Sequence, residues 1–200
     1  MDTIRQNIEN RDFQKLIDLC ESLEFENSAF PTPDLPQSTI YATLLGAYLV
    51  VNDLNSARFL RKRILQHYKV EADVPEELNA IWGVGAALWI RSFAKAYSVL
   101  DTYAWSTDLR PIMALLRDTV QEQAYQLISK SFSYIKVTSA AEMLGMPQDV
   151  VSEALTKKGW LLDNESQLLK PAPIPMAPQE KISLDQLSRL EDIVVYLESS

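Results

Sequence analysis

The stretch AAEMLGMPQDVVSEALTKKGW, residues 140–160, has the pattern of two short helices joined by a tight turn. Gly145 supplies the left-handed residue that commonly ends a helix, and Pro147 is tolerated in the first turn of the next one. Gly159 closes the second run. Each run places apolar residues on one helical face, at Ala140, Ala141 and Leu144 and then at Val150, Val151, Ala154 and Leu155. The stretch therefore predicts a helix-turn-helix, which packs against protein as readily as against DNA.

The residues on either side of this stretch have the pattern of short strands. A β-rich step at 135–137 precedes it, and two strand-like pieces, 160–163 and 167–170, follow it around a turn. Three strands around a helix-turn-helix describe a winged helix. We predict that a winged-helix module spans residues 135–170.

The first 134 residues are helical by period almost throughout, and they contain an internal repeat of about 40 residues. The repeat is visible in NRDFQKLIDL (10–19), VNDLNSARFL (51–60) and IRSFAKAYSVL (90–100), where a polar turn precedes regularly spaced apolar or small residues. A helical hairpin of this size cannot bury its apolar face alone and must stack on its neighbour. We predict a helical-repeat domain over 1–134, in which 108–135 forms one helix or two.

The end of the sequence combines a proline-rich segment with a strongly amphipathic stretch. Four prolines within 171–178 predict an extended linker over 171–182. Residues 183–200 predict a helix, which opens with a capping box at Ser183 and Gln186. We interpret its apolar stripe as a partner-binding surface, with docking on its own domain as the alternative. The stripe consists of Leu184, Leu187, Leu190, Ile193, Val194 and Leu197.

Composition and charge argue against binding to nucleic acid. The 200 residues carry 27 acids against 19 bases, and the net charge of −8 repels a phosphate backbone. In the helix-turn-helix, the second helix has Asp149 and Glu153 where a DNA reader needs side chains that contact phosphates and bases. We interpret the one basic run as a solvated helix face, with a patch for an acidic protein as the alternative. That run consists of Arg58, Arg61, Lys62, Arg63 and Lys69.

The residues that enzymes use for catalysis are scarce. One histidine, His67, and one cysteine, Cys20, cannot supply the ligands of a zinc site. The sequence lacks the GxSxG elbow of a serine hydrolase. GVGAAL (83–88) matches only half of a dinucleotide fingerprint, and close helix packing explains its two glycines better. We predict that the protein is not an enzyme and binds no cofactor or metal.

The sequence also indicates a compartment. A lone cysteine indicates a reducing environment. The longest apolar runs, such as 41–51, are too short to span a bilayer, and the first residues lack the pattern of a signal peptide. We expect the protein in the cytoplasm and nucleus, without a membrane partner.

Six stretches of the sequence stand out in these segments: SARFLRKRI (56–64), IWGVGAALWIRSFAKAY (81–97), YAWS (103–106), AAEMLGM (140–146), KKGW (157–160) and RLEDIVVYLE (189–198). Together with the order of the segments, they resemble the PCI domain, a scaffold shared by subunits of the proteasome lid, the COP9 signalosome and translation initiation factor three. The signalosome subunits are the most similar. Arg61 departs from the family pattern, which often has a tryptophan there.

The resemblance implies a mainly α fold, with stacked helical-hairpin repeats, a winged-helix module and a C-terminal amphipathic helix. It implies a non-catalytic scaffold subunit in the assembly that removes a ubiquitin-like modifier from the cullins of ubiquitin ligases. In that assembly another subunit holds the zinc, and the subunits associate through their winged helices and C-terminal helices. The alternatives are a subunit of the proteasome lid or of initiation factor three, or a free-standing winged-helix adaptor.

Overall fold

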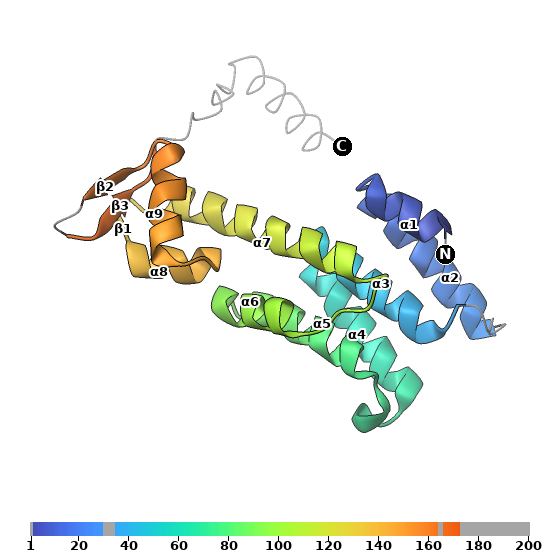
Figure 1. Ribbon diagram of the computed structural model, residues 1–200. Helices are drawn as coiled ribbons and strands as arrows, with labels where there is room; N and C mark the ends of the chain where they lie inside the picture. The colour runs from blue at the N-terminus through green and yellow to red at the C-terminus, as the bar shows by residue number, and fades with distance from the viewer. Residues whose placement is uncertain (1, 30–34, 164–165, 173–200) are drawn as a thin grey trace, which may run out of the picture.

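The computed structural model describes residues 2–29, 35–163 and 166–172, which are mostly helical (Figure 1). Its helices are α1 (Asp2–Glu9), α2 (Phe13–Ala29), α3 (Gln37–Val50), α4 (Leu54–Tyr68), the 3-10 turn η1 (Glu71–Asp73), α5 (Glu76–Trp89), α6 (Phe93–Thr102), α7 (Arg110–Ser131), α8 (Val137–Leu144) and α9 (Gln148–Lys157). Its strands are β1 (Ile135–Lys136), β2 (Leu161–Asp163) and β3 (Leu168–Lys170).

Three consecutive helical hairpins, α1–α2, α3–α4 and α5–α6, turn with the same backbone geometry. The turn residues Arg11, Asn52 and Arg91 have φ angles of 55°, 61° and 58°. In each turn, the amide of the residue that follows donates a hydrogen bond to the carbonyl of the residue five positions before it, as in a Schellman motif. The three bonds run from Asp12 to Asn7, from Asp53 to Tyr48 and from Ser92 to Ala87. The repeat predicted from the sequence is therefore a repeat of whole hairpins.

When the three copies of the repeat are aligned, equivalent residues have the same structural role in each hairpin. Helices α2, α4 and α6 begin at Phe13, Leu54 and Phe93, the first aligned position. The second aligned position is fully buried in all three hairpins, at Leu16, Ala57 and Ala96. Each hairpin thus buries the same face against its neighbours, as stacked repeats require.

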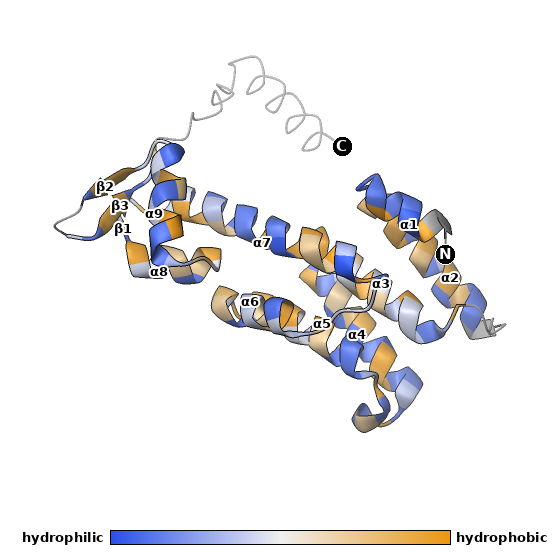
Figure 2. Cartoon of the chain, in the orientation of Figure 1, coloured by the Kyte–Doolittle hydropathy of each residue, from blue (hydrophilic) through white to orange (hydrophobic). Residues whose placement is uncertain are grey.

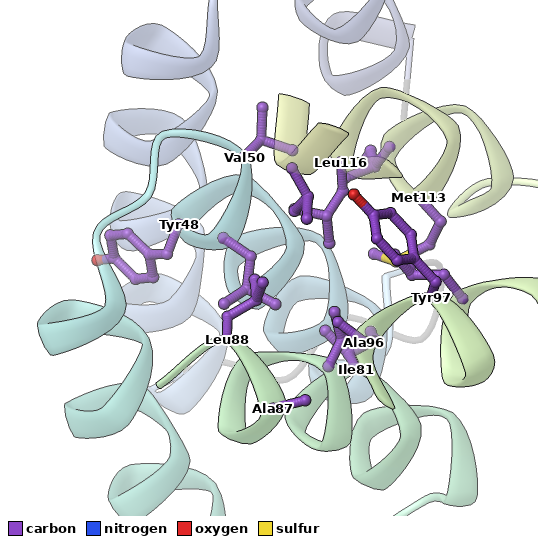
Figure 3. Packing of buried hydrophobic residues seen from close by; sticks show 14 of the residues in the cluster. Tyr48, Val50, Ile81, Ala87, Leu88, Ala96, Tyr97, Met113 and Leu116 are labelled. Atoms are coloured by element: carbon purple, nitrogen blue, oxygen red, sulfur yellow. The ribbon is translucent and has the colours of Figure 1, made fainter. Parts of the chain in front are cut away.

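Helix α3 forms the centre of the core. Its residues are buried without interruption from Ile40 to Val50, and it contacts α2, α4, α5 and α7. A Cβ on Gly46 would lie 2.9 Å from Cγ2 of Ile112, so the glycine permits the close approach of α3 to α7. Figure 3 shows side chains from α5, α6 and α7, among them Leu88, Tyr97 and Leu116, gathered around this helix.

Helix α7 runs from the repeats to the winged helix as a single rod (Figure 1). Its buried residues recur at helical spacing, so one stripe faces the protein while polar residues face outward (Figure 2). It contacts α3 and α6 in the repeats and α8 in the winged helix. The stripe consists of Ile112, Met113, Leu116, Val120, Ala124 and Ile128.

The winged helix has the predicted order of elements. Its strands form an antiparallel sheet in the order β1–β3–β2, with Leu169 of β3 paired to Ile135 on one side and to Leu162 on the other. Together with the repeats, this sheet and the pair α8–α9 confirm the predicted fold class for the described residues.

The strands are shorter than the sequence predicted. The amide of Trp160 donates to the carbonyl of Leu155, so Trp160 closes the turn that follows α9, and β2 begins only at Leu161. Gln167 has a φ of 53°, a turn conformation. Val137 already begins α8. The predicted boundaries at 134, 170 and 182 stay predictions, and the linker from 173 onward lies outside the described residues.

Candidate protein-binding site

The winged helix is fixed to the repeats at the turn between α8 and α9. Gly145 has a φ of 63°, as predicted, and the ring of Tyr97 on α6 lies directly against it. The Tyr97 hydroxyl donates to the carbonyl of Met143 at 3.3 Å, and the Gln121 amide donates to that of Leu144 at 2.9 Å. These bonds satisfy carbonyls that the end of a helix leaves unpaired. Burial raises the pKa of Tyr97 to about 12.

Helix α9 presents carboxylates to solvent. Asp149 and Glu153 are exposed, as the sequence predicted, while Val151 and Leu155 are buried against the sheet and α8. The predicted apolar stripe is wrong at Val150, which is 49% exposed. Neighbouring residues of a helix point about 100° apart, and here Val151 faces the core while Val150 points toward solvent.

The two lysines at the end of α9 have different surroundings. Lys157 is exposed, whereas the Nζ atom of Lys158 lies 3.8 Å from the ring centroid of Tyr125 on α7. A cation over an aromatic face is held by the ring quadrupole. The surface of α9 therefore combines the carboxylates of Asp149 and Glu153 with the ammonium of Lys157, while the Lys158 ammonium lies over Tyr125; this surface matches protein better than phosphate.

The outer face of the sheet carries a row of exposed side chains, which we call the outer sheet row. Lys170 of β3 pairs with Leu161 of β2, and the register of β1 and β3 places Tyr134 on the opposite side of Lys170. Leu161 is 67% and Tyr134 58% exposed, and the Lys170 ammonium lies 5.8 Å from the Tyr134 ring centroid. Large exposed apolar side chains that lie together commonly mark a surface for protein contact.

The sheet also ends in two short edge strands, β1 and β2. An edge strand presents backbone donors and acceptors that a strand of another chain can pair with. The outer sheet row and these edges together form the candidate protein-binding site of the winged helix.

The surroundings of Cys20 and His67 do not favour nucleophilic attack or metal binding. Cys20 is fully buried, and burial, with a contribution from Glu21, raises the pKa of its thiol to about 12. A thiol in that state is a poor nucleophile and a poor metal ligand. His67 is exposed, and its ring meets those of Tyr41 and Tyr68 edge-on at 5.7 and 4.9 Å. Within the described ranges no three His, Cys, Asp or Glu residues gather as a metal site would need.

The two glycines of the GVGAAL segment lie in α5 and behave differently. A Cβ on Gly85 would lie 3.1 Å from Cδ2 of Leu49, so close packing on α3 explains this glycine. The same explanation is wrong for Gly83, since no heavy atom lies within 4 Å of a Cβ built there.

Among the described helices, none combines the length and apolarity needed to cross a membrane.

The interpretation of the basic run as a solvated helix face is wrong at Arg61. Its residue is only 5% exposed, and its Nη2 atom lies 3.1 Å from the exposed carboxylate of Glu71. Its Nη1 atom is buried without a hydrogen-bond partner in the described part of the chain. Element η1 packs back against α4 and brings Glu71 to the guanidinium.

Other members of the run are also engaged. Arg63 binds both carboxylate oxygens of Glu24 on α2, at 2.8 and 2.9 Å. The Arg58 guanidinium lies 5.5 Å from the ring centroid of Trp89 on α5. The run therefore joins α4 to its neighbours and is not one solvated patch.

The predicted partner-binding stripe of the C-terminal helix lies outside the described residues. It stays a prediction for Leu184, Leu187, Leu190, Ile193, Val194 and Leu197.

Residues 36–180 match the model of the CSN8/PSMD8/EIF3K family. This span begins at α3 and includes the whole winged helix. The chain belongs to this family. The resemblance to PCI-domain subunits, predicted from the sequence, is thereby confirmed.

Members of the CSN8/PSMD8/EIF3K family are similar to the chain over nearly its whole length. The COP9 signalosome complex subunit 8 of Xenopus laevis is 34% identical over 192 residues, 94% of this chain and 93% of that protein. The protein of the same name from Danio rerio is 32% identical over 183 residues, 88% and 92% of the two chains. The one from Arabidopsis thaliana is 29% identical over 195 residues, 98% and 97%.

Proposed function

We propose that this chain is a non-catalytic scaffold subunit of the COP9 signalosome. The observation that carries the proposal is the alignment of 94% of the chain with a relative of that name. The family description names three kinds of subunit. Relatives from Xenopus, Arabidopsis and Dictyostelium all have the signalosome name, which favours this assembly over the other two.

The scaffold role is to hold sibling subunits through two surfaces. One is the winged helix, where the outer sheet row and the edge strands β1 and β2 offer apolar area and backbone groups. The other is the C-terminal helix of 183–200, whose apolar stripe packs against the C-terminal helices of the other subunits. The sequence pattern of that helix supports this assignment.

In this role the chain supports the removal of a ubiquitin-like modifier from the cullins of ubiquitin ligases, and it contributes no catalytic group. The buried neutral thiol of Cys20 and the edge-packed ring of His67 support this division of labour. We further propose that the chain works in the cytoplasm and nucleus, and that it binds neither nucleic acid nor membrane. Imaging of a fluorescent fusion tests the location.

Affinity purification of the tagged full chain, followed by mass spectrometry, tests the assignment. We expect recovery of signalosome subunits together with isopeptidase activity toward modified cullins. The same purification distinguishes the alternatives, since recovery of ribosomes with initiation factor three, or of the proteasome lid, would replace the signalosome assignment.

A further inference from the structure

A hollow opens on the helical repeats, beside the turns of the second and third hairpins. We call it the turn groove. Its volume is about 440 Å³, within the range of roughly 300–1,000 Å³ typical of ligand pockets. It lies between the α3–α4 turn, the α5–α6 turn and α7, and the lining residues that matter below are Asn52, Asn55, Trp89, Arg91 and Gln123.

The turn groove has an exposed apolar margin. Trp89 in its lining is 49% exposed, and Ile90 and Val51, the chain neighbours of the lining residues Arg91 and Asn52, are 63% and 43% exposed. In the first hairpin the matching turn position is the polar Asn10. Exposure of Val51, Ile90 and Trp89 to water is unfavourable in the free chain. A partner that covers these side chains therefore gains affinity.

The lining of the turn groove includes three amide side chains that are open to a partner. The side chains of Asn52, Asn55 and Gln123 make no hydrogen bond within the residues that the structure describes. A carboxamide both donates and accepts, and an extended peptide presents alternating N–H and C=O groups. Three free carboxamides around one hollow therefore match a peptide backbone.

With Arg58 beside Trp89, the turn groove has two basic side chains and one acidic side chain, although the chain carries a net charge of −8. Arg91 has no ion pair among the described residues, and Arg58 lies over the Trp89 ring. The carboxylate of Asp53 is engaged, because it accepts the Ser56 amide at 3.0 Å as the N-cap of α4. Two exposed guanidinium groups beside an occupied carboxylate are complementary to an acidic segment.

We propose that the turn groove binds an extended acidic peptide segment of a partner protein. An aromatic or large aliphatic side chain of that segment lies on Trp89, its carboxylates pair with Arg58 and Arg91, and its backbone bonds to the carboxamides. The proposal uses no residue of the winged helix or of 183–200, so it stands independently of the proposed signalosome assignment.

To test the proposal, short random peptides displayed on phage are selected for binding to the immobilised full chain. We expect enriched peptides with several acidic residues around an aromatic or large aliphatic one. The enriched peptides are then labelled with fluorescein and titrated. Arg91→Glu and Trp89→Ala should each weaken binding about tenfold or more, as losses at buried anchors do. Raising the salt from about 0.1 M to about 0.5 M should also weaken it.

The chain supplies a matched control, since Arg11 occupies the same left-handed turn position in the first hairpin, outside the groove. Arg11→Glu makes the same change in charge and backbone position and should leave binding within about twofold, because a distant surface charge is screened. Circular dichroism melts of all three variants check folding. Enriched peptides without acidic residues, or binding unchanged by both Arg91→Glu and Trp89→Ala, would overturn the proposal. Full competition by an equal concentration of single-stranded oligonucleotide would assign the groove to nucleic acid instead.

Discussion

The ring of Tyr97 on α6 lies against Gly145 at the turn between α8 and α9, so closely that a Cβ on the glycine would lie 2.6 Å from Cγ of the ring. The same glycine has a φ of 63°, a conformation that side chains disfavour. This one position therefore sets both the angle between the two helices of the winged helix and the place where the module rests on the repeats.

Gly145→Ala should lower the free energy of unfolding by about 2–4 kcal/mol, the sum of a left-handed backbone penalty and an overpacked contact. Urea denaturation measures the loss. Gly83→Ala is the matched control, because it lies in α5 with open space around it. That variant should be neutral or more stable by up to about 1 kcal/mol. Equal effects at the two glycines would contradict the role assigned to the Tyr97 contact.

Arg61→Met should raise the free energy of unfolding by about 1 kcal/mol. It removes a buried donor without an acceptor, which costs about 1–3 kcal/mol. It gives up a pair with the exposed Glu71, which contributes about 0–1 kcal/mol.

Arg63→Met provides the opposite case on the same helix. It breaks a two-bond pair with Glu24, whose side chain is only 15% exposed, and should lower the free energy of unfolding by about 1–2 kcal/mol. Denaturation of the Arg61→Met and Arg63→Met variants under one set of conditions tests these two opposite effects. A loss of stability in both would show that Arg61 is paired as well as Arg63 is.

Alkaline pH should destabilise the fold through Cys20. Its folded-state pKa of about 12 lies above the ordinary value of 9.0, so above pH 9 the unfolded chain releases a proton that the folded chain retains. The contribution is therefore complete below pH 9 and is lost as the pH rises toward 12, by up to about 1.4 kcal/mol per pH unit. Unfolding curves of the wild-type chain and of Cys20→Ala, compared from neutral to alkaline pH, isolate this residue. Parallel decline in the two proteins would contradict it.

The features that could be predicted from the sequence are those with local signals. A turn residue, the start of a helix and its apolar period lie within a few positions of one another, as at Asn52, Leu54 and Ala57. The turn at Gly145 and the strand-like pieces on either side of the two short helices likewise indicated the winged helix. Such signals fix helices and turns wherever the rest of the chain lies.

The features that could not be predicted depend on contacts between separate elements. Arg61 is buried and paired with Glu71 of η1, and no periodic pattern in 58–69 indicates that η1 packs back on α4. The outer sheet row joins Leu161 of β2 and Tyr134, which directly precedes β1, only because β3 lies between β1 and β2. Alternation along each strand indicates which residues face outward, but the row depends on the pairing register.

The outer sheet row should be needed for assembly but not for folding. Tyr134→Asp with Leu161→Asp places two charges on exposed positions, so the melting temperature should stay close to that of the wild type. The same charges should prevent a partner from covering the row, because an unpaired charge is costly to bury. Pull-down with sibling signalosome subunits measures the loss. Val70→Asp, at a position 54% exposed before η1, is the control and should bind normally.

We propose that the C-terminal helix holds the chain in place as a signalosome scaffold. Leu190→Asp with Val194→Asp puts charges into the predicted apolar stripe, which contributes roughly 1.5–3 kcal/mol per buried aliphatic side chain before ordering costs. The most direct measurement replaces the endogenous chain in cells by this double variant and follows the ratio of modified to unmodified cullin, together with the subunits that co-purify. We predict an unchanged circular dichroism melt, loss of the sibling subunits and a rise in modified cullin. Undiminished co-purification with an unchanged cullin ratio would contradict the claim.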